Sequence, residues 1–163
     1  MKANYAALLS RDESALTNVI HSALEIKKAY IEEDEFDQGR RNLLNFGHDF
    51  GHAIEAATNY NLSHGLAVVA GIILANHVAT IRGLLSEEKE LSFKQDLLWP
   101  LIKTAIGHNK LNPVKIIEAM RQDKKRTGAG LALVMLKNDG SLVLVGDLTD
   151  NEARAAIEHF SKD

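Results

Sequence analysis

Three histidines lie close together in the middle of the sequence, and imidazole is a common ligand of divalent metal ions. His48 and His52 are four residues apart, so in a helix both rings would lie on one face, one turn apart. Each follows a glycine, which is costly in a helix and suggests the close approach of a ligand or another backbone segment. His64 follows after a short polar connection and would return towards the first helix. Each histidine alone could be structural or solvated, but together they favour a divalent-metal site.

The composition restricts which other ligands and partners to expect. The 163 residues include no cysteine, so a metal ion would have to be held by histidine and carboxylate side chains. The formal net charge is −3, and no stripe of basic and aromatic residues is present, so nucleic acid is not an expected partner. The longest apolar stretch, Leu66–Ala75, is too short to span a bilayer, and the N-terminus lacks the apolar segment of a signal peptide. We therefore expect a cytoplasmic protein with no membrane partner.

Four further polar residues could act beside the histidines, and each has a plainer alternative. Arg41 and Asn45 precede the first histidine by seven and three residues. An arginine fork next to a metal suits a carboxylate or phosphate, although Arg41 could instead pair with the acidic residues at 32–35. Asn45 could simply be the N-cap of the histidine helix. Lys27 could lay its stem along an apolar helix face, and Lys124 could interact with a helix C-terminus.

Helices must position these side chains, because the apolar residues recur at helical spacing over most of the chain. A capping box at Ser10–Glu13 predicts the start of a helix that runs from about 12 to 32. Further helices are expected over 48–58, from Ser63 or His64 to about 82, from Ser86 onwards with a kink or break at Pro100, and over about 113–122.

The pattern changes near the C-terminus, where two short apolar runs at 131–136 and 141–145 flank an Asp-Gly turn. This arrangement predicts a β-hairpin. A second capping box at Thr149–Glu152 predicts a final short helix. We expect a mainly α fold with one hairpin, as a single domain over 1–163. Gly128-Ala129-Gly130 precedes a strand rather than following one, so no dinucleotide-binding unit is predicted in this chain.

The remaining histidines are not expected to take part in a site. His77 lies thirteen residues after His64 and would face about 220° round the helix from it. His21, His108 and His159 have no nearby polar residues in the sequence that suggest a ligand set.

A longer pattern around the histidines resembles a known family. The segment Gly39–Glu55, with Gly47-His48-Asp49-Phe50-Gly51-His52 at its centre, resembles the signature of the 3-dehydroquinate synthases. The segment Leu62–Val68 resembles the His-Gly segment that follows it in the family. Shorter matches flank both and fall in the family's order: Glu25-Ile26-Lys27, Asp34-Glu35 and Met120–Lys125. The resemblance covers nearly the whole chain from about Tyr5 and implies the helical C-terminal domain of such an enzyme.

The resemblance implies an activity and a set of roles. The family enzyme is a carbon–oxygen lyase of the shikimate pathway. It converts 3-deoxy-arabino-heptulosonate 7-phosphate into 3-dehydroquinate and phosphate with NAD and a divalent metal, usually zinc. His48 and His64 would be metal ligands, and His52 would contact the substrate and relay protons. The substrate's hydroxyl, carboxylate and phosphate oxygens would be held by Lys27, Arg41, Asn45 and Lys124. The full-length enzyme would be a homodimer.

The chain also departs from the family pattern. No segment before Tyr5 matches the family's upstream glutamate ligand, and the NAD-binding N-terminal half has no counterpart here. We therefore expect NAD to be bound by a domain absent from this chain, and the chain alone to be inactive. Asp49 stands where the family usually has Thr or Ser, and Leu66 where many members have Glu. The alternatives are another sugar-phosphate cyclase such as a cyclitol synthase, the metal domain of an iron-type alcohol dehydrogenase, or a non-catalytic helical interaction domain.

Overall fold

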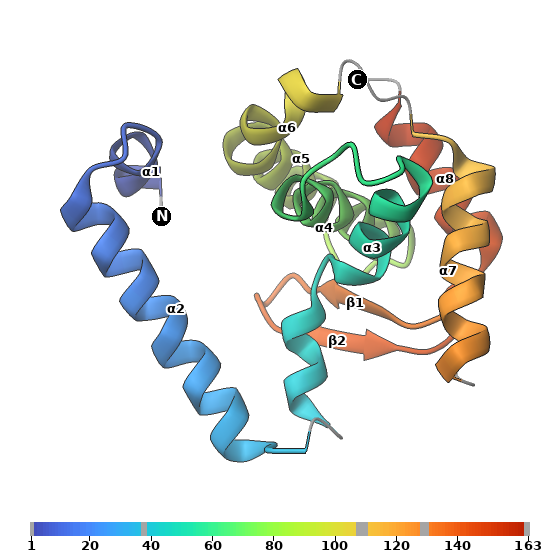
Figure 1. Cartoon of the computed structure of the whole chain (residues 1–163), viewed down its shortest axis with the longest axis horizontal. Helices are drawn as coiled ribbons and strands as arrows, with labels where there is room; N and C mark the ends of the chain where they lie inside the picture. The colour runs from blue at the N-terminus through green and yellow to red at the C-terminus, as the bar shows by residue number, and fades with distance from the viewer. Residues whose placement is uncertain (1, 37–38, 107–110, 128–130, 162–163) are drawn as a thin grey trace. The chain divides into compact units, whose positions relative to one another are not determined.

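The computed structural model describes residues 2–36, 39–106, 111–127 and 131–161, with the backbone alone at 2–4 and 123–127 (Figure 1). The chain forms two compact units, Met1–Leu44 and Asn45–Asp163, which are described separately below. The described elements are mainly helical, with one two-stranded sheet near the C-terminus, which confirms the predicted fold class. A single domain over 1–163 stays a prediction.

The first unit consists of α1 (Lys2–Leu9) and the long helix α2 (Glu13–Glu33). The predicted extent of α2 is confirmed, but the predicted capping box at Ser10 is wrong. Asp12 is the N-cap, and its carboxylate accepts a hydrogen bond from the Ala15 amide at 2.8 Å. The reason is that α1 extends to Leu9, so the Ser10 hydroxyl donates to the Ala7 carbonyl of that preceding helix.

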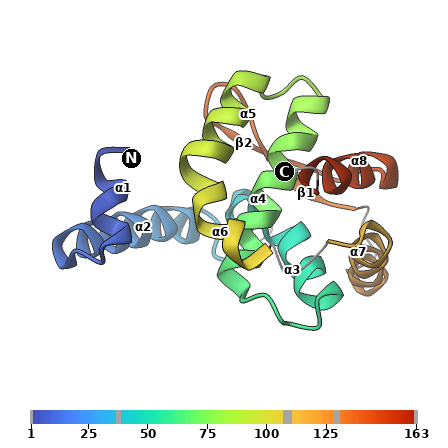
Figure 2. The same ribbon diagram turned by 90° about the horizontal axis from the view of Figure 1, so that it is seen from above.

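The second unit is built around α4 (His64–Ile81), which carries nine buried residues (Figure 2). Helix α3 (His48–Ala57) packs on α4 and is in turn contacted by α7 (Pro113–Thr127), whereas α8 (Asp150–Phe160) packs directly on α4. The predicted start and end of α4 are confirmed, because Ser63 is its N-cap and Gly83 follows its C-cap with φ 70°. The length and apolar composition of α4 would also suit a membrane span, but half of that stretch is buried in the protein, as expected of a core helix.

The segment that begins at Ser86 is continuous but irregular. Ser86 caps α5 (Glu87–Phe93), a π-helical turn η2 (Lys94–Leu98) follows, and α6 (Trp99–Ile106) completes the segment. Pro100 is the second residue of α6, so the irregular turn falls just before the proline, as the predicted kink requires.

The predicted hairpin is present. Strands β1 (Leu133–Leu136) and β2 (Leu142–Val145) pair antiparallel with Leu136 opposite Leu142, and Gly140 takes φ 84° in the turn. The first three residues of β1 are buried against the core. The predicted capping box of α8 is also confirmed, with Thr149 and Glu152 bonded reciprocally.

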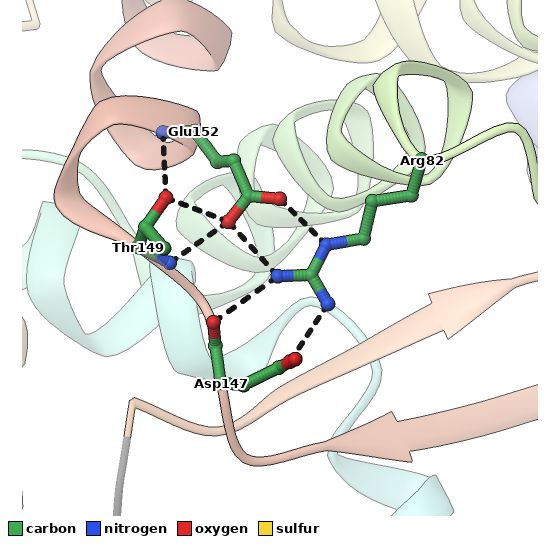
Figure 3. Close-up of polar contacts among 4 residues, drawn as sticks. All are labelled: Arg82, Asp147, Thr149 and Glu152. Carbon is green, nitrogen blue, oxygen red and sulfur yellow. Dashed lines mark hydrogen bonds and ion pairs between the residues drawn. The ribbon is translucent and has the colours of Figure 1, made fainter.

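An arginine at the end of α4 links that helix to the segment between β2 and α8 (Figure 3). Arg82 donates Nε and Nη2 to the two carboxylate oxygens of Glu152 at 2.7 and 2.9 Å, and Nη1 to Asp147 at 2.7 Å. The bidentate geometry is the favourable one for an arginine–carboxylate pair. Arg82 lowers the pKa of Glu152 to about 2, so this carboxylate stays ionised far into acid.

Candidate metal and substrate site

The three signature histidines form a triangle in the second unit. His48 is the first residue of α3, His52 lies one turn later, and His64 is the first residue of α4. The ring centroid of His48 lies 5.6 Å from that of His52 and 5.4 Å from that of His64. The ring centroids of His52 and His64 are 5.8 Å apart. The predicted return of the chain is therefore confirmed. It is made by the left-handed residues Asn59 and Tyr60 between the two helices.

Glycines allow α3 and α4 to approach closely enough for this triangle to form. A Cβ atom on Gly71 of α4 would lie 2.0 Å from the carbonyl oxygen of Gly47, and one on Gly51 would lie 3.2 Å from Cα of Val68. Gly47 is the N-cap of α3 with φ 82°, a conformation that glycine adopts without strain. The glycine before each histidine thus allows the close approach of another backbone segment, which is one of the two explanations that the sequence left open, the other being a ligand.

The environment of His48 is suited to metal ligation. Its Nδ1 is buried and has no hydrogen-bond partner among the described residues. Burial lowers the pKa of His48; the backbone at Phe46 and Asn45 opposes this, while repulsion from His52 and His64 adds to it, and the net pKa is lowered. The ring is thereby kept in the neutral form that binds metal ions. A buried nitrogen without a partner is costly, and a bound cation would satisfy it.

A carboxylate completes the cluster. Nδ1 of His64 lies 3.1 Å from Oε2 of Glu55, whose side chain is only 14% exposed. Ligand atoms of His52, Glu55 and His64 all lie within 4.8 Å of one another. Sequence reasoning missed Glu55, although its positions three and seven residues after His52 and His48 place it on the same helix face.

Histidine and carboxylate together form a donor set typical of zinc, so these residues fit the metal that the resemblance implies. The compact group contains His52 and Glu55 as well as His64, while the ring of His48 lies against it. The division into the ligands His48 and His64 and the proton-relay residue His52 stays a prediction.

The other predicted site residues lie on elements other than the two helices that carry the histidine triangle. Asn45 ends the 3₁₀ turn η1 (Arg40–Asn45) and is exposed, so the alternative that it caps α3 is wrong, because Gly47 occupies that position. Lys27 is exposed on α2 in the first unit. Lys124 belongs to the last turns of α7, where its side chain lies outside the described residues.

Arg41 also belongs to the first unit, where it contacts the acidic segment that follows α2. Its backbone amide donates to Asp34 at 3.0 Å, and its Nη1 donates to the carbonyl oxygen of Glu35 at 3.0 Å. The ion pair to this segment is made by the neighbouring Arg40, which bonds Glu33. Arg41 is therefore oriented by hydrogen bonds, and its guanidinium keeps further donors for an anion.

Asp49, which stands where the resembled family has Thr or Ser, has a structural contact. Its carboxylate accepts from the amide of Val134 at 3.4 Å and so connects α3 to β1. Leu66, at the other departure from the family pattern, is partly buried and packs against the core. Both residues therefore contribute to packing near the histidine triangle.

A sequence model of the family described as 3-dehydroquinate synthase C-terminal matches residues 1–126 of this chain. The chain belongs to the 3-dehydroquinate synthase family, as its C-terminal domain. The 3-dehydroquinate synthase of Nitrosospira multiformis is 40% identical over 147 residues, which are 86% of this chain and 38% of that protein. The corresponding protein of Dehalococcoides mccartyi is 30% identical over 160 residues, 98% of this chain and 44% of that protein. The chain thus spans less than half the length of these relatives.

Solved structures show the same fold. A 2-epi-5-epi-valiolone synthase from Streptomyces hygroscopicus, solved with NAD⁺ and Zn²⁺ bound, superposes with a TM-score of 0.83 at 23% identity. The match covers 99% of this chain and 45% of that one. A 2-deoxy-scyllo-inosose synthase complexed with carbaglucose-6-phosphate, NAD⁺ and Co²⁺ has a TM-score of 0.66 at 21% identity, over 90% of this chain and 41% of that one. At these identities the likeness shows that the 3-dehydroquinate synthase C-terminal domain shares its fold with these cyclases.

Proposed function

We propose that this chain is the metal- and substrate-binding domain of a 3-dehydroquinate synthase, which converts 3-deoxy-arabino-heptulosonate 7-phosphate into 3-dehydroquinate and phosphate in the shikimate pathway. The observation that carries the proposal is the histidine triangle, assembled within the family's matched region. Both sequence relatives described above are named 3-dehydroquinate synthase, which supports this substrate.

In this proposal His48 and His64 hold a zinc or similar divalent ion, and Glu55 orients the ring of His64 through Nδ1. A bound ion would supply Lewis-acid polarisation of substrate hydroxyl oxygens, and hydride chemistry would be supplied by NAD, which we expect another domain to hold. His52 is exposed beside the pair, so its imidazole nitrogen is placed to take and return a hydroxyl proton.

The cationic residues would bind the two anionic groups of the substrate, its carboxylate and its phosphate. Arg41, already oriented by its hydrogen bonds, offers a planar fork that suits the carboxylate. Lys27 and Lys124 supply positive charge for the phosphate, and Asn45 supplies an amide for a hydroxyl.

A second candidate function is a different sugar-phosphate cyclase. The fold is shared with a valiolone synthase and an inosose synthase, and the chain carries Asp49 and Leu66 at two positions where the resembled family usually differs. The signature from Arg41 to Glu55 argues against an iron-type alcohol dehydrogenase. A homodimer of the full-length enzyme, located in the cytoplasm, belongs to the same proposal.

Binding of sugar phosphates to the zinc-loaded chain, followed by calorimetry, tests the proposal. We expect 3-deoxy-arabino-heptulosonate 7-phosphate to bind more tightly than a heptulose phosphate without the carboxylate or a hexose phosphate. His48→Ala should abolish zinc-dependent binding, whereas His21→Ala, an exposed histidine on α2, should not. Preference for a sugar phosphate that lacks a carboxylate would favour the second candidate. Unchanged zinc affinity in both His48→Ala and His64→Ala would exclude this metal site.

A further inference from the structure

A second cluster of potential metal ligands lies at the other end of α4. His77 is thirteen residues beyond His64, which corresponds to about 20 Å along the helix axis. It meets Glu90 from α5 and His159 from the last turn of α8. Three helices of the second unit therefore converge here, away from the site described above.

The atoms of this cluster are close enough to share one ion. Nδ1 of His77 lies 2.8 Å from Oε1 of Glu90, and the rings of His77 and His159 are stacked with centroids 3.9 Å apart. One ligand atom from each of the three residues can be chosen so that all lie within 4.8 Å of one another. The only other group with this property in the described part of the chain is the one that contains His52, Glu55 and His64.

Burial makes Glu90 a candidate anionic ligand. Glu90 is only 8% exposed, and a buried carboxylate is costly unless positive charge or hydrogen-bond donors compensate it. Its carboxylate lies beside two imidazoles, and a divalent cation held among them would supply that positive charge.

We propose that His77, Glu90 and His159 form a second site for a divalent transition metal of the zinc type. Two histidines and one glutamate are a recognised zinc ligand set that leaves the fourth position of a tetrahedron to water. The ion would fasten α5 and α8 to the central helix. Binding of this ion would be independent of the chemistry proposed for the histidine triangle.

The stacked rings define what must change on binding. Their planes are within 4° of parallel, so the nitrogen lone pairs do not converge on one point, and one ring must turn. His159 is exposed in the last turn of α8, whereas His77 is partly buried, so His159 is the ring expected to turn. The His77 side chain is 17% exposed and is held by Glu90, so it would keep its place.

Zinc stoichiometry of the intact chain, measured by competition with a chromophoric chelator, tests this site. We expect His159→Ala to weaken one equivalent by at least about 100-fold and to leave the equivalent that depends on His48 unchanged. Glu90→Gln should have the same effect, because the amide keeps the shape of the side chain but not its charge. His21→Ala should retain both equivalents. With Co²⁺ as the probe, His159→Ala should remove one set of visible absorption bands.

The two metal sites can fail separately. If the wild type binds only one equivalent, which is lost in His48→Ala, or if His159→Ala retains both equivalents, the second site does not exist and the cluster is only an ion pair. If the wild type binds one equivalent of zinc that is lost in His159→Ala and retained in His48→Ala, the second site is supported and the metal site of the proposed function is contradicted. Circular dichroism of each variant establishes that the helices are retained.

Discussion

The two histidine clusters of the second unit differ in how they are assembled and in how their polar atoms are satisfied. The first draws His48, His52 and Glu55 from two successive turns of α3 and His64 from the start of α4, whereas the second draws its residues from α4, α5 and α8. In the first, the ring centroids stand 5.4–5.8 Å apart and one buried nitrogen has no partner among the described residues. In the second, the rings of His77 and His159 stack, and the carboxylate of Glu90 is hydrogen-bonded to His77.

This difference indicates how much each cluster would be stabilised by a bound ion. The first is spaced to receive an ion, since His48 is partly buried, its pKa is lowered, and its Nδ1 has no hydrogen-bond partner among the described residues. The second already satisfies its buried carboxylate through the hydrogen bond between His77 and Glu90, so an ion there would replace one stabilising interaction with another. We therefore expect metal removal to disturb the first cluster more than the second.

The largest effect is expected from Gly71→Ala, which attacks the assembly of the first cluster alone. The added methyl group would lie 2.0 Å from the Gly47 carbonyl oxygen, so α3 and α4 must separate. We expect a loss of about 3 kcal/mol in the free energy of unfolding, measured in urea, together with loss of the His48-dependent zinc equivalent. Gly65→Ala is the matched control, because a Cβ atom there meets nothing within 4 Å, and it should stabilise α4 by about 0.5–1 kcal/mol. Equal effects of the two changes would contradict the close-packing argument.

The next largest effect is expected from Arg82→Met, which loosens the helices that carry the second cluster. Arg82 lies one turn beyond His77 and joins α4 to the start of α8, the helix that carries His159 (Figure 3). We expect a loss of about 2 kcal/mol in the free energy of unfolding, because Glu152 would be left without its bidentate partner. Zinc affinity should fall at the second site only. Arg154→Met, an exposed arginine on α8, serves as control and should change neither quantity.

Acid should reproduce part of the Arg82→Met effect. The folded-state pKa of Glu152 is lowered from 4.5 to about 2, so its contribution to stability is fully present above pH 4.5 and is lost as the pH falls to about 2. Urea unfolding of the wild type across this range should show a decline that is shallower in Arg82→Met. Parallel pH profiles for the two proteins would show that the pair contributes nothing to acid stability.

The smallest effect is expected from Glu55→Gln, which sharpens the role of the carboxylate in the first cluster. If Glu55 orients His64 through Nδ1, the amide should weaken zinc binding at that site by about tenfold, equivalent to about 1.4 kcal/mol, with little change in stability. If Glu55 is itself a ligand, the loss should reach that of His64→Ala. Zinc affinities of the two variants, compared in the His159→Ala background, distinguish these roles.

Much of the fold could be predicted because its signals are local. The capped ends of α4 and α8, the turn of the hairpin and the paired glycines before His48 and His52 are each determined by residues within a few positions of one another. The start of α2 was predicted correctly, but its N-cap was assigned to the wrong residue. Ser10 and Asp12 are both residue types that cap helices well, and which of them caps α2 depends on α1. The sequence of α1 is only weakly amphipathic, so that helix was not predicted.

The sequence by itself determined the first cluster, because the helical repeat and one short turn are enough to bring His48, His52 and His64 together. Only the tertiary structure decided the second. His77 and His159 are 82 residues apart, and their meeting depends on how α5 and α8 pack on α4, which the sequence pattern around either histidine does not specify. His77 does face away from the signature site, as its position on the helix predicted, and the direction in which it faces is where the second cluster forms.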